Sequence, residues 1–184
     1  MQTIEYIIIC IALCIPLMIE LRRSSAVSNI KSINGIGISV AVSVLQIALM
    51  LGGFYLGKTL RFEPAELCGT IALALLVVVA VKMFITSLSK KERPSYDLSK
   101  AATVLPLGIA LGINTFITGL GLGMSTDNTK RAALTTSIAI AVCSLLFSEI
   151  GIMLGRQNKA LREKRQWMIA LLLYLAAIAW HVAF

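Results

Sequence analysis

Hydrophobic residues occur in six long stretches along this chain, separated by short segments that are rich in charged and turn-forming residues. The stretches cover residues 4–21, 33–57, 65–88, 101–123, 132–155 and 167–184. A helix needs about 20 apolar residues to cross the hydrocarbon core of a bilayer, and each stretch is of that order. The connectors are too short to fold as domains of their own. The pattern predicts an all-α, polytopic integral membrane protein with six transmembrane helices in a single domain.

Composition supports this prediction and excludes several classes of protein. Hydrophobic residues make up 58% of the chain and charged residues only 14%, which leaves too little polar surface to cover a soluble globule of 184 residues. Residues 52–59 match the Gly-x-x-x-x-Gly-Lys-Ser/Thr pattern of phosphate loops, but they end an apolar stretch, and the chain has no room for a nucleotide-binding domain. We therefore expect neither an enzyme nor a cofactor, and any transport would run on ion gradients or on the membrane potential.

Basic residues predict the orientation of the helices. The first, third and fifth connectors carry most of them: Arg22, Arg23, Lys31, Lys90, Lys91, Arg93, Lys100, Arg156, Lys159, Arg162, Lys164 and Arg165. The second and fourth carry only Lys58, Arg61, Lys130 and Arg131. Because basic loops stay in the cytoplasm, the odd connectors should face the cytoplasm and both termini the outside. This placement also accounts for the net charge of +8 without a nucleic-acid partner.

A sequence echo at a spacing of 98 residues divides the chain into two halves. Ile-Ala-Leu-Cys-Ile-Pro at 11–16 returns as Ile-Ala-Leu-Gly-Ile-Asn at 109–114, and Gly-x-x-x-Gly at 53–57 returns at 151–155. A unit of three helices is odd in number, so the second copy must enter the membrane from the opposite side. The echo predicts two inverted three-helix repeats, 1–88 and 101–184, which are typical of secondary transporters.

The first and fourth spans are where we expect a substrate site. In inverted-repeat folds the site lies near the bilayer midplane, at helices weakened by Pro or Gly. Pro16 lies in the first span and Pro106 in the fourth, and several glycines follow Pro106. The fourth span is therefore predicted to be the helix that breaks most easily. The glycines four residues apart fit close helix packing equally well.

Polar side chains inside the spans are few, and each one needs a partner or a pathway because it is costly in hydrocarbon. Asn114, with Thr115 and Thr118 beside it, could offer oxygen ligands to a cation or could bond to a neighbouring helix, and the same two alternatives hold for Gln46. Glu149 could bind a divalent cation, reach the interface or pair with Lys82. Lys82 itself could extend to the cytoplasmic interface.

Three segments carry a family resemblance. They are Ala-Leu-Gly-Ile-Asn-Thr-Phe-Ile-Thr-Gly-Leu-Gly at 110–121, Ser-Glu-Ile-Gly-Ile-Met-Leu-Gly-Arg at 148–156, and Lys-Met at 82–83. The chain resembles the MntP family of bacterial manganese efflux pumps, six-helix proteins that are distantly related to LysE-type exporters. The resemblance implies a multi-pass protein of the bacterial cytoplasmic (inner) membrane that exports manganese(II).

The chain departs from the family at its charged positions. Family members carry an Asp in the first helix, a Glu in the second and an Asp in the fourth, and these positions fall on Pro16, Gln46 and Asn114. Glu149 stands where the family usually has Thr. The expected metal ligands are then Asn114, Gln46 and Glu149, and the transport path would add Thr115, Thr118, Pro16 and Lys82.

Two alternatives to metal export remain open at this point. An exporter of a neutral or zwitterionic solute would need no intramembrane carboxylate, and amides with Lys82 would serve it. A membrane accessory protein could keep the fold without transporting anything. The expected partners are membrane lipid and the transported cation or solute, and a homo-oligomer also stays open.

Overall fold

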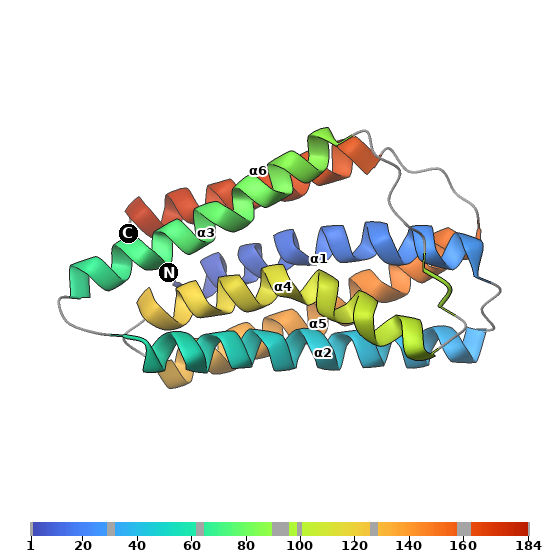
Figure 1. Cartoon of the computed structure of the whole chain (residues 1–184), viewed down its shortest axis with the longest axis horizontal. Helices are drawn as coiled ribbons and strands as arrows, with labels where there is room; N and C mark the ends of the chain where they lie inside the picture. Colours follow the sequence, from blue (N-terminus) through green and yellow to red (C-terminus); the bar gives the residue numbers. More distant parts are fainter. Residues whose placement is uncertain are drawn as a thin grey trace.

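The computed structural model describes residues 2–28, 32–61, 65–89, 96–98, 101–125, 129–157 and 163–183. Six long helices account for nearly all of these residues (Figure 1). They are α1 (Gln2–Val27), α2 (Ser32–Thr59), α3 (Ala65–Leu88), α4 (Ala101–Ser125), α5 (Thr129–Arg156) and α6 (Glu163–Ala183). The described residues contain no strand.

Length and apolar composition explain why these segments are helical. Within the described residues, α1 to α5 are each long and apolar enough to cross a membrane. In lipid a spanning segment must satisfy its own backbone hydrogen bonds, which a helix does. The sixth predicted span, 167–184, falls within α6 except for its last residue, which lies outside the described part. The prediction of an all-α polytopic membrane protein is confirmed.

The helices pair in a symmetric pattern. The most extensive contacts are those of α1 with α5 and of α2 with α4. Exchanging α1–α3 for α4–α6 converts the first of these pairs into the second and converts α1 with α6 into α4 with α3, which are also in contact. The pairs α2 with α5 and α3 with α6 convert into themselves. An inverted repeat would give this pattern, although the boundaries 1–88 and 101–184 stay a prediction.

The two ends of the bundle differ in the connections that they carry. Helices α1, α3 and α5 begin at one end of the bundle, where α2, α4 and α6 end, and the opposite holds at the other end of the bundle (Figure 1). The three odd connectors therefore join helices at the same end of the bundle, as the charge pattern requires.

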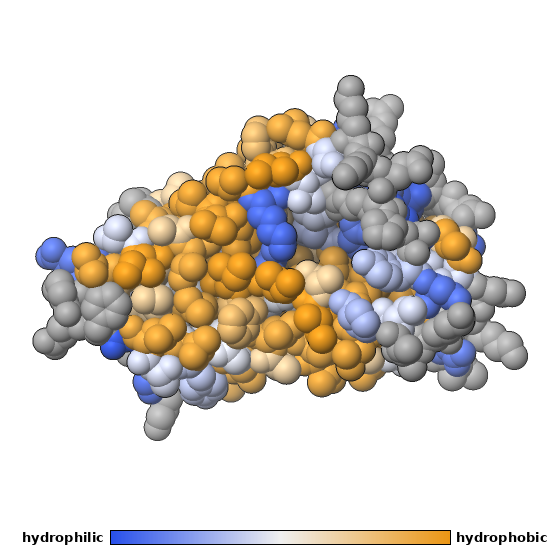
Figure 2. Space-filling view, in the orientation of Figure 1, coloured by the Kyte–Doolittle hydropathy of each residue, from blue (hydrophilic) through white to orange (hydrophobic). Residues whose placement is uncertain are grey.

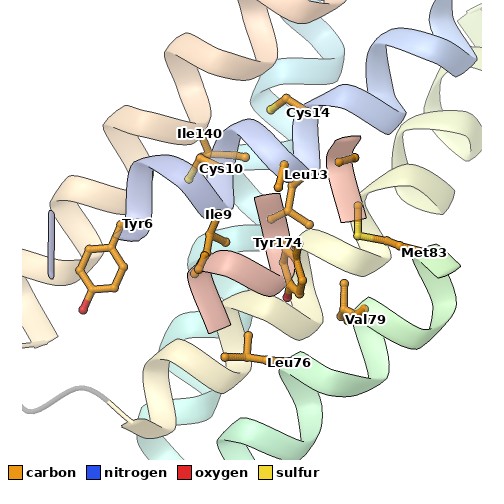
Figure 3. Close-up of a cluster of buried hydrophobic side chains, with 14 of the residues drawn as sticks. Tyr6, Ile9, Cys10, Leu13, Cys14, Leu76, Val79, Met83, Ile140 and Tyr174 are labelled. Atoms are coloured by element: carbon orange, nitrogen blue, oxygen red, sulfur yellow. The ribbon is translucent and has the colours of Figure 1, made fainter. Parts of the chain in front are cut away.

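Helix α1 is the most enclosed element of the bundle. In its most apolar stretch 78% of the residues are buried, against 33–44% in the corresponding stretches of α2 to α5. Its buried side chains meet those of α3, α5 and α6 in one apolar cluster (Figure 3). The labelled members are Tyr6, Ile9, Cys10, Leu13, Cys14, Leu76, Val79, Met83, Ile140 and Tyr174. Residues on α1 are thus placed to face several other helices at once.

Glycines let the two most extensive helix pairs approach closely. On α2, Gly53 and Gly57 face the backbone carbonyls of Phe116 and Leu120 on α4. A Cβ at Gly119 of α4 would lie 2.5 Å from the carbonyl oxygen of Met50 on α2. No side chain fits at such a distance, so the glycine pairs are explained by close packing.

The same device recurs between α1 and α5. A Cβ at Gly151 would lie 2.6 Å from the carbonyl oxygen of Met18, and Gly155 faces Arg22 and Ser25. The echoed glycines of the sequence therefore serve equivalent interfaces in the two halves.

Helices α1 and α4 run without interruption through Pro16 and Pro106. The expectation that the fourth span breaks most easily is not met in this conformation. Each proline removes only one backbone donor, and the tight contacts of α4 with α2 hold the glycines after Pro106 in helical geometry.

Replacing Gly53 by Ala should destabilise the protein by about 1–3 kcal/mol, because the added methyl group overlaps the carbonyl of Phe116. Thermal unfolding in detergent micelles measures the effect. Gly37→Ala on the same helix is the matched control, since a Cβ at Gly37 meets no atom within 4 Å. Equal melting temperatures for the two variants would refute the packing role of Gly53.

Candidate functional site: a cavity between α1, α3 and α4

A cavity of about 210 Å³ lies between α1, α3 and α4. Its lining residues are Leu13, Pro16, Leu17, Glu20, Lys82, Thr86, Tyr96, Leu107, Ala110, Leu111, Asn114 and Trp167. Because Lys82 and Ala110 are exposed, the cavity opens on the surface between α3 and α4. Figure 2 shows a hydrophilic spot at this seam in a face that is otherwise largely hydrophobic. A cavity that contains several polar side chains thus interrupts the apolar band.

Three of the predicted path residues meet in this cavity: Pro16 from α1, Lys82 from α3 and Asn114 from α4. The Nζ atom of Lys82 donates a hydrogen bond to Oδ1 of Asn114 over 2.7 Å. Lys82 therefore turns toward a neighbouring helix instead of extending alone to the interface. The first and fourth helices, where the sequence predicts a substrate site, both contribute to the cavity wall.

Glu20 is a lining residue that is absent from the predicted set. It is only 7% exposed and follows Pro16 by four residues, so the two share one face of α1. In the sequence, Glu20 stands at the end of a predicted span beside Arg22 and Arg23, which places it at the membrane interface. The signal that could have identified it is this spacing from Pro16, where the family resemblance expects a carboxylate.

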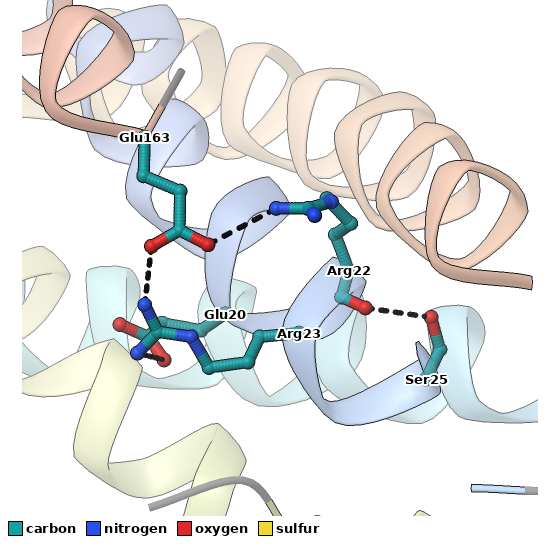
Figure 4. Close-up of polar contacts among 5 residues, drawn as sticks. All are labelled: Glu20, Arg22, Arg23, Ser25 and Glu163. Carbon is teal, nitrogen blue, oxygen red and sulfur yellow. Dashed lines mark hydrogen bonds and ion pairs between the residues drawn. The ribbon is translucent and has the colours of Figure 1, made fainter. Parts of the chain in front are cut away.

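Glu20 adjoins a group of ion pairs that joins α1 to the start of α6 (Figure 4). The Nη1 atom of Arg23 lies 4.0 Å from Oε2 of Glu20, and the same guanidinium pairs with Glu163. Arg22 also binds Glu163, with Nη1 3.0 Å from Oε1. These contacts fix the end of α1 and hold the Glu20 side chain beside the cavity. Two arginines close to two carboxylates make the group nearly neutral overall.

Gln46 and Thr115 form a separate contact between α2 and α4. The hydroxyl of Thr115 donates a hydrogen bond to Oε1 of Gln46 over 2.6 Å, and both side chains are buried. The Nε2 atom of Gln46 has no hydrogen-bond partner in the described part of the chain. Neither residue lines the cavity. In this conformation the contact is the interhelical bond that the sequence left open as an alternative.

Thr118 faces a third direction. Its hydroxyl lies 2.7 Å from the hydroxyl of Tyr174 on α6, and both residues are buried. Asn114, Thr115 and Thr118 therefore connect α4 to α3, α2 and α6 respectively. Only Asn114 faces the cavity.

Glu149 lies half-buried on α5 and does not line the cavity. The structure gives it no hydrogen bond or ion pair with another described residue. Among the described residues, no three His, Cys, Asp or Glu side chains are close enough to hold a metal ion. Of the predicted metal ligands Asn114, Gln46 and Glu149, only Asn114 is in the cavity, and the set stays a prediction.

Comparison with known proteins identifies the family to which the chain belongs. The model of a family described as "Putative manganese efflux pump" matches residues 29–180. The chain belongs to the MntP family. No curated protein and no solved structure matches it. The MntP match begins after the end of α1, so the helix that supplies Pro16 and Glu20 lies outside it.

Removing the Thr115 hydroxyl with Thr115→Val should destabilise the protein by about 1–2 kcal/mol, because Oε1 of Gln46 loses its donor inside the bundle. Unfolding in detergent measures the loss. The double variant Gln46→Leu with Thr115→Val should cost less than the sum of the two single variants, because it leaves no buried amide. Strict additivity would contradict an energetic coupling between the two side chains.

Proposed function

We propose that this chain exports manganese(II) from the bacterial cytoplasm through the cavity between α1, α3 and α4. The observation that carries the proposal is Glu20, a buried carboxylate that lines the cavity together with the amide oxygen of Asn114. Manganese prefers hard oxygen ligands, and a divalent cation needs negative charge to leave water. Membership in the MntP family supports the same ion.

The size of the cavity favours a partly hydrated ion. One water needs only about 10–15 Å³ of such space, and the cavity offers about 210 Å³. The hydroxyls of Thr86 and Tyr96 lie in the same lining and can bind water. Two protein oxygens with several retained waters are therefore enough for an ion that passes through, in the manner of Mg²⁺ sites that keep part of their hydration.

The position of the cavity supports loading from the cytoplasm. Its lining runs from Asn114, halfway along α4, to Tyr96 in the third connection and Trp167 near the start of α6. That end of the bundle carries the odd connectors, whose basic residues favour the cytoplasmic side. Both termini would then lie outside. Rocking of the halves 1–88 and 101–184 against each other would expose the cavity to the other side.

One observation favours a second candidate, a zwitterionic solute. In the described part of the chain, the cavity lining contains one carboxylate, Glu20, and one ammonium group, Lys82. These two groups would complement the amino and carboxylate groups of an amino-acid-like substrate. The family places manganese first, and a transport assay separates the two substrates directly.

Manganese content in an exporter-deficient bacterium grown at high manganese tests the proposal. Expression of the chain should lower cellular manganese, and Glu20→Gln should abolish most of that effect because it removes the one negative charge among the described lining residues. Glu149→Gln should leave export largely intact, since Glu149 lies outside the cavity. Glu66→Gln, at an exposed carboxylate on α3, is the matched control.

The outcomes separate the alternatives. Loss of export in Glu149→Gln with full export in Glu20→Gln would move the ion path to α5. Unchanged manganese with the protein present in the membrane would refute manganese export, and amino-acid efflux from the same cells would then distinguish a zwitterion exporter from a protein that does not transport.

A further inference from the structure

Among the described residues that line the cavity, Lys82 is the one with a cationic side chain, and it is bound to a group that a transported cation would use. Its ammonium group donates to Oδ1 of Asn114 over 2.7 Å. Asn114 lines the cavity from the middle of α4. An ammonium group and a metal ion cannot both occupy the near side of one amide oxygen, because both are positively charged.

The depth of Lys82 makes the arrangement informative. It lies six residues before the end of α3, which is about 9 Å along the helix axis. A lysine at this depth can reach the polar interface with its long stem. In this structure its ammonium group bonds instead to an oxygen on the neighbouring helix. The cavity therefore holds a positive charge at a site of cation-binding chemistry.

Charge balance points in the same direction. Among the lining residues, Glu20 supplies one negative charge and Lys82 one positive charge. Arg23 lies 4.0 Å from Glu20 and already offsets its charge, so Lys82 supplies a surplus positive charge, and a divalent cation would add to it unless the ammonium group moved away. Net charge inside a membrane protein is costly, so the ion and the ammonium group should exclude each other.

We propose that Lys82 is a tethered counter-cation that occupies the Asn114 oxygen while the cavity is empty and is displaced when the transported cation binds. This inference rests on the proposed function. Displacement by the ion weakens ion binding, which aids release on the far side. Return of the ammonium group restores its hydrogen bond to Asn114 while the empty carrier reorients.

The proposed role of Lys82 predicts different effects on two kinds of manganese flux, and measuring both fluxes tests it. Exchange of manganese for manganese needs only the loaded carrier to reorient, whereas net efflux also needs the empty carrier to return. The purified full chain in lipid vesicles allows both fluxes and the affinity for Mn²⁺ to be measured. Lys82→Gln removes the charge but keeps an N–H donor for Asn114, so the variant should still fold.

We expect Lys82→Gln to bind Mn²⁺ at least about tenfold more tightly, since a like charge has left the site. Exchange should continue while net efflux falls sharply. Lys82→Arg should keep both fluxes because it keeps the charge. Lys58→Gln, at an exposed lysine at the other end of the bundle, should match the wild type in all three measurements.

Each result has a defined meaning. Unchanged or weaker Mn²⁺ binding by Lys82→Gln, or equal losses of exchange and net efflux, would overturn the tethered cation and leave manganese export standing. Absence of Mn²⁺ binding and of both fluxes in the wild type would overturn the proposed function, and the role of Lys82 with it.

Discussion

The hydrocarbon of the bilayer offers no hydrogen-bond partner, and this constraint decides where each polar side chain of the bundle points. On α4, Asn114, Thr115 and Thr118 each find a partner on a different helix. These contacts fix the rotation of α4 relative to α3, α2 and α6. The same constraint makes the polar side chains of the cavity informative, because it costs stability to keep polar groups inside a membrane protein and away from bulk water.

Close packing of helix backbones holds the helices in the positions that these hydrogen bonds require. Gly53 and Gly119 bring α2 and α4 into backbone contact, and Gly151 does the same for α5 with α1. Lipid tails are as apolar as the side chains, so burial of apolar surface adds little to helix association in a membrane, and packing and hydrogen bonds must provide it. Helix α1 packs most extensively against α5, and α4 packs most extensively against α2, while α1 and α4 make few contacts with each other. This leaves space between them for the cavity.

The sequence predicts the helices well because apolar length is a strong and local signal, and it also identifies Asn114 and Lys82 as unusual because a polar group in an apolar stretch is conspicuous. It does not predict their partners. Helices that are apolar on all sides carry little information about which face meets which neighbour. The contact of Thr115 with Gln46 joins residues 69 positions apart and depends on the rotation of both helices. The sequence does not identify Glu20 as a cavity residue for a related reason. The position of its side chain depends on Arg23, which pairs with Glu163 of α6, and the local sequence does not predict this contact.

The three neutral residues at positions where the family resemblance expects carboxylates have different consequences in the structure. Gln46 lies outside the cavity and is bound to Thr115, so neutrality there affects helix packing rather than the cavity. Pro16 and Asn114 both line the cavity. Glu20, one turn along the same face of α1, returns negative charge to that wall, and Lys82 stands against Asn114 on the other. The charged and polar side chains that distinguish this cavity therefore come from α1, α3 and α4, and they include the two helices whose sequences echo each other.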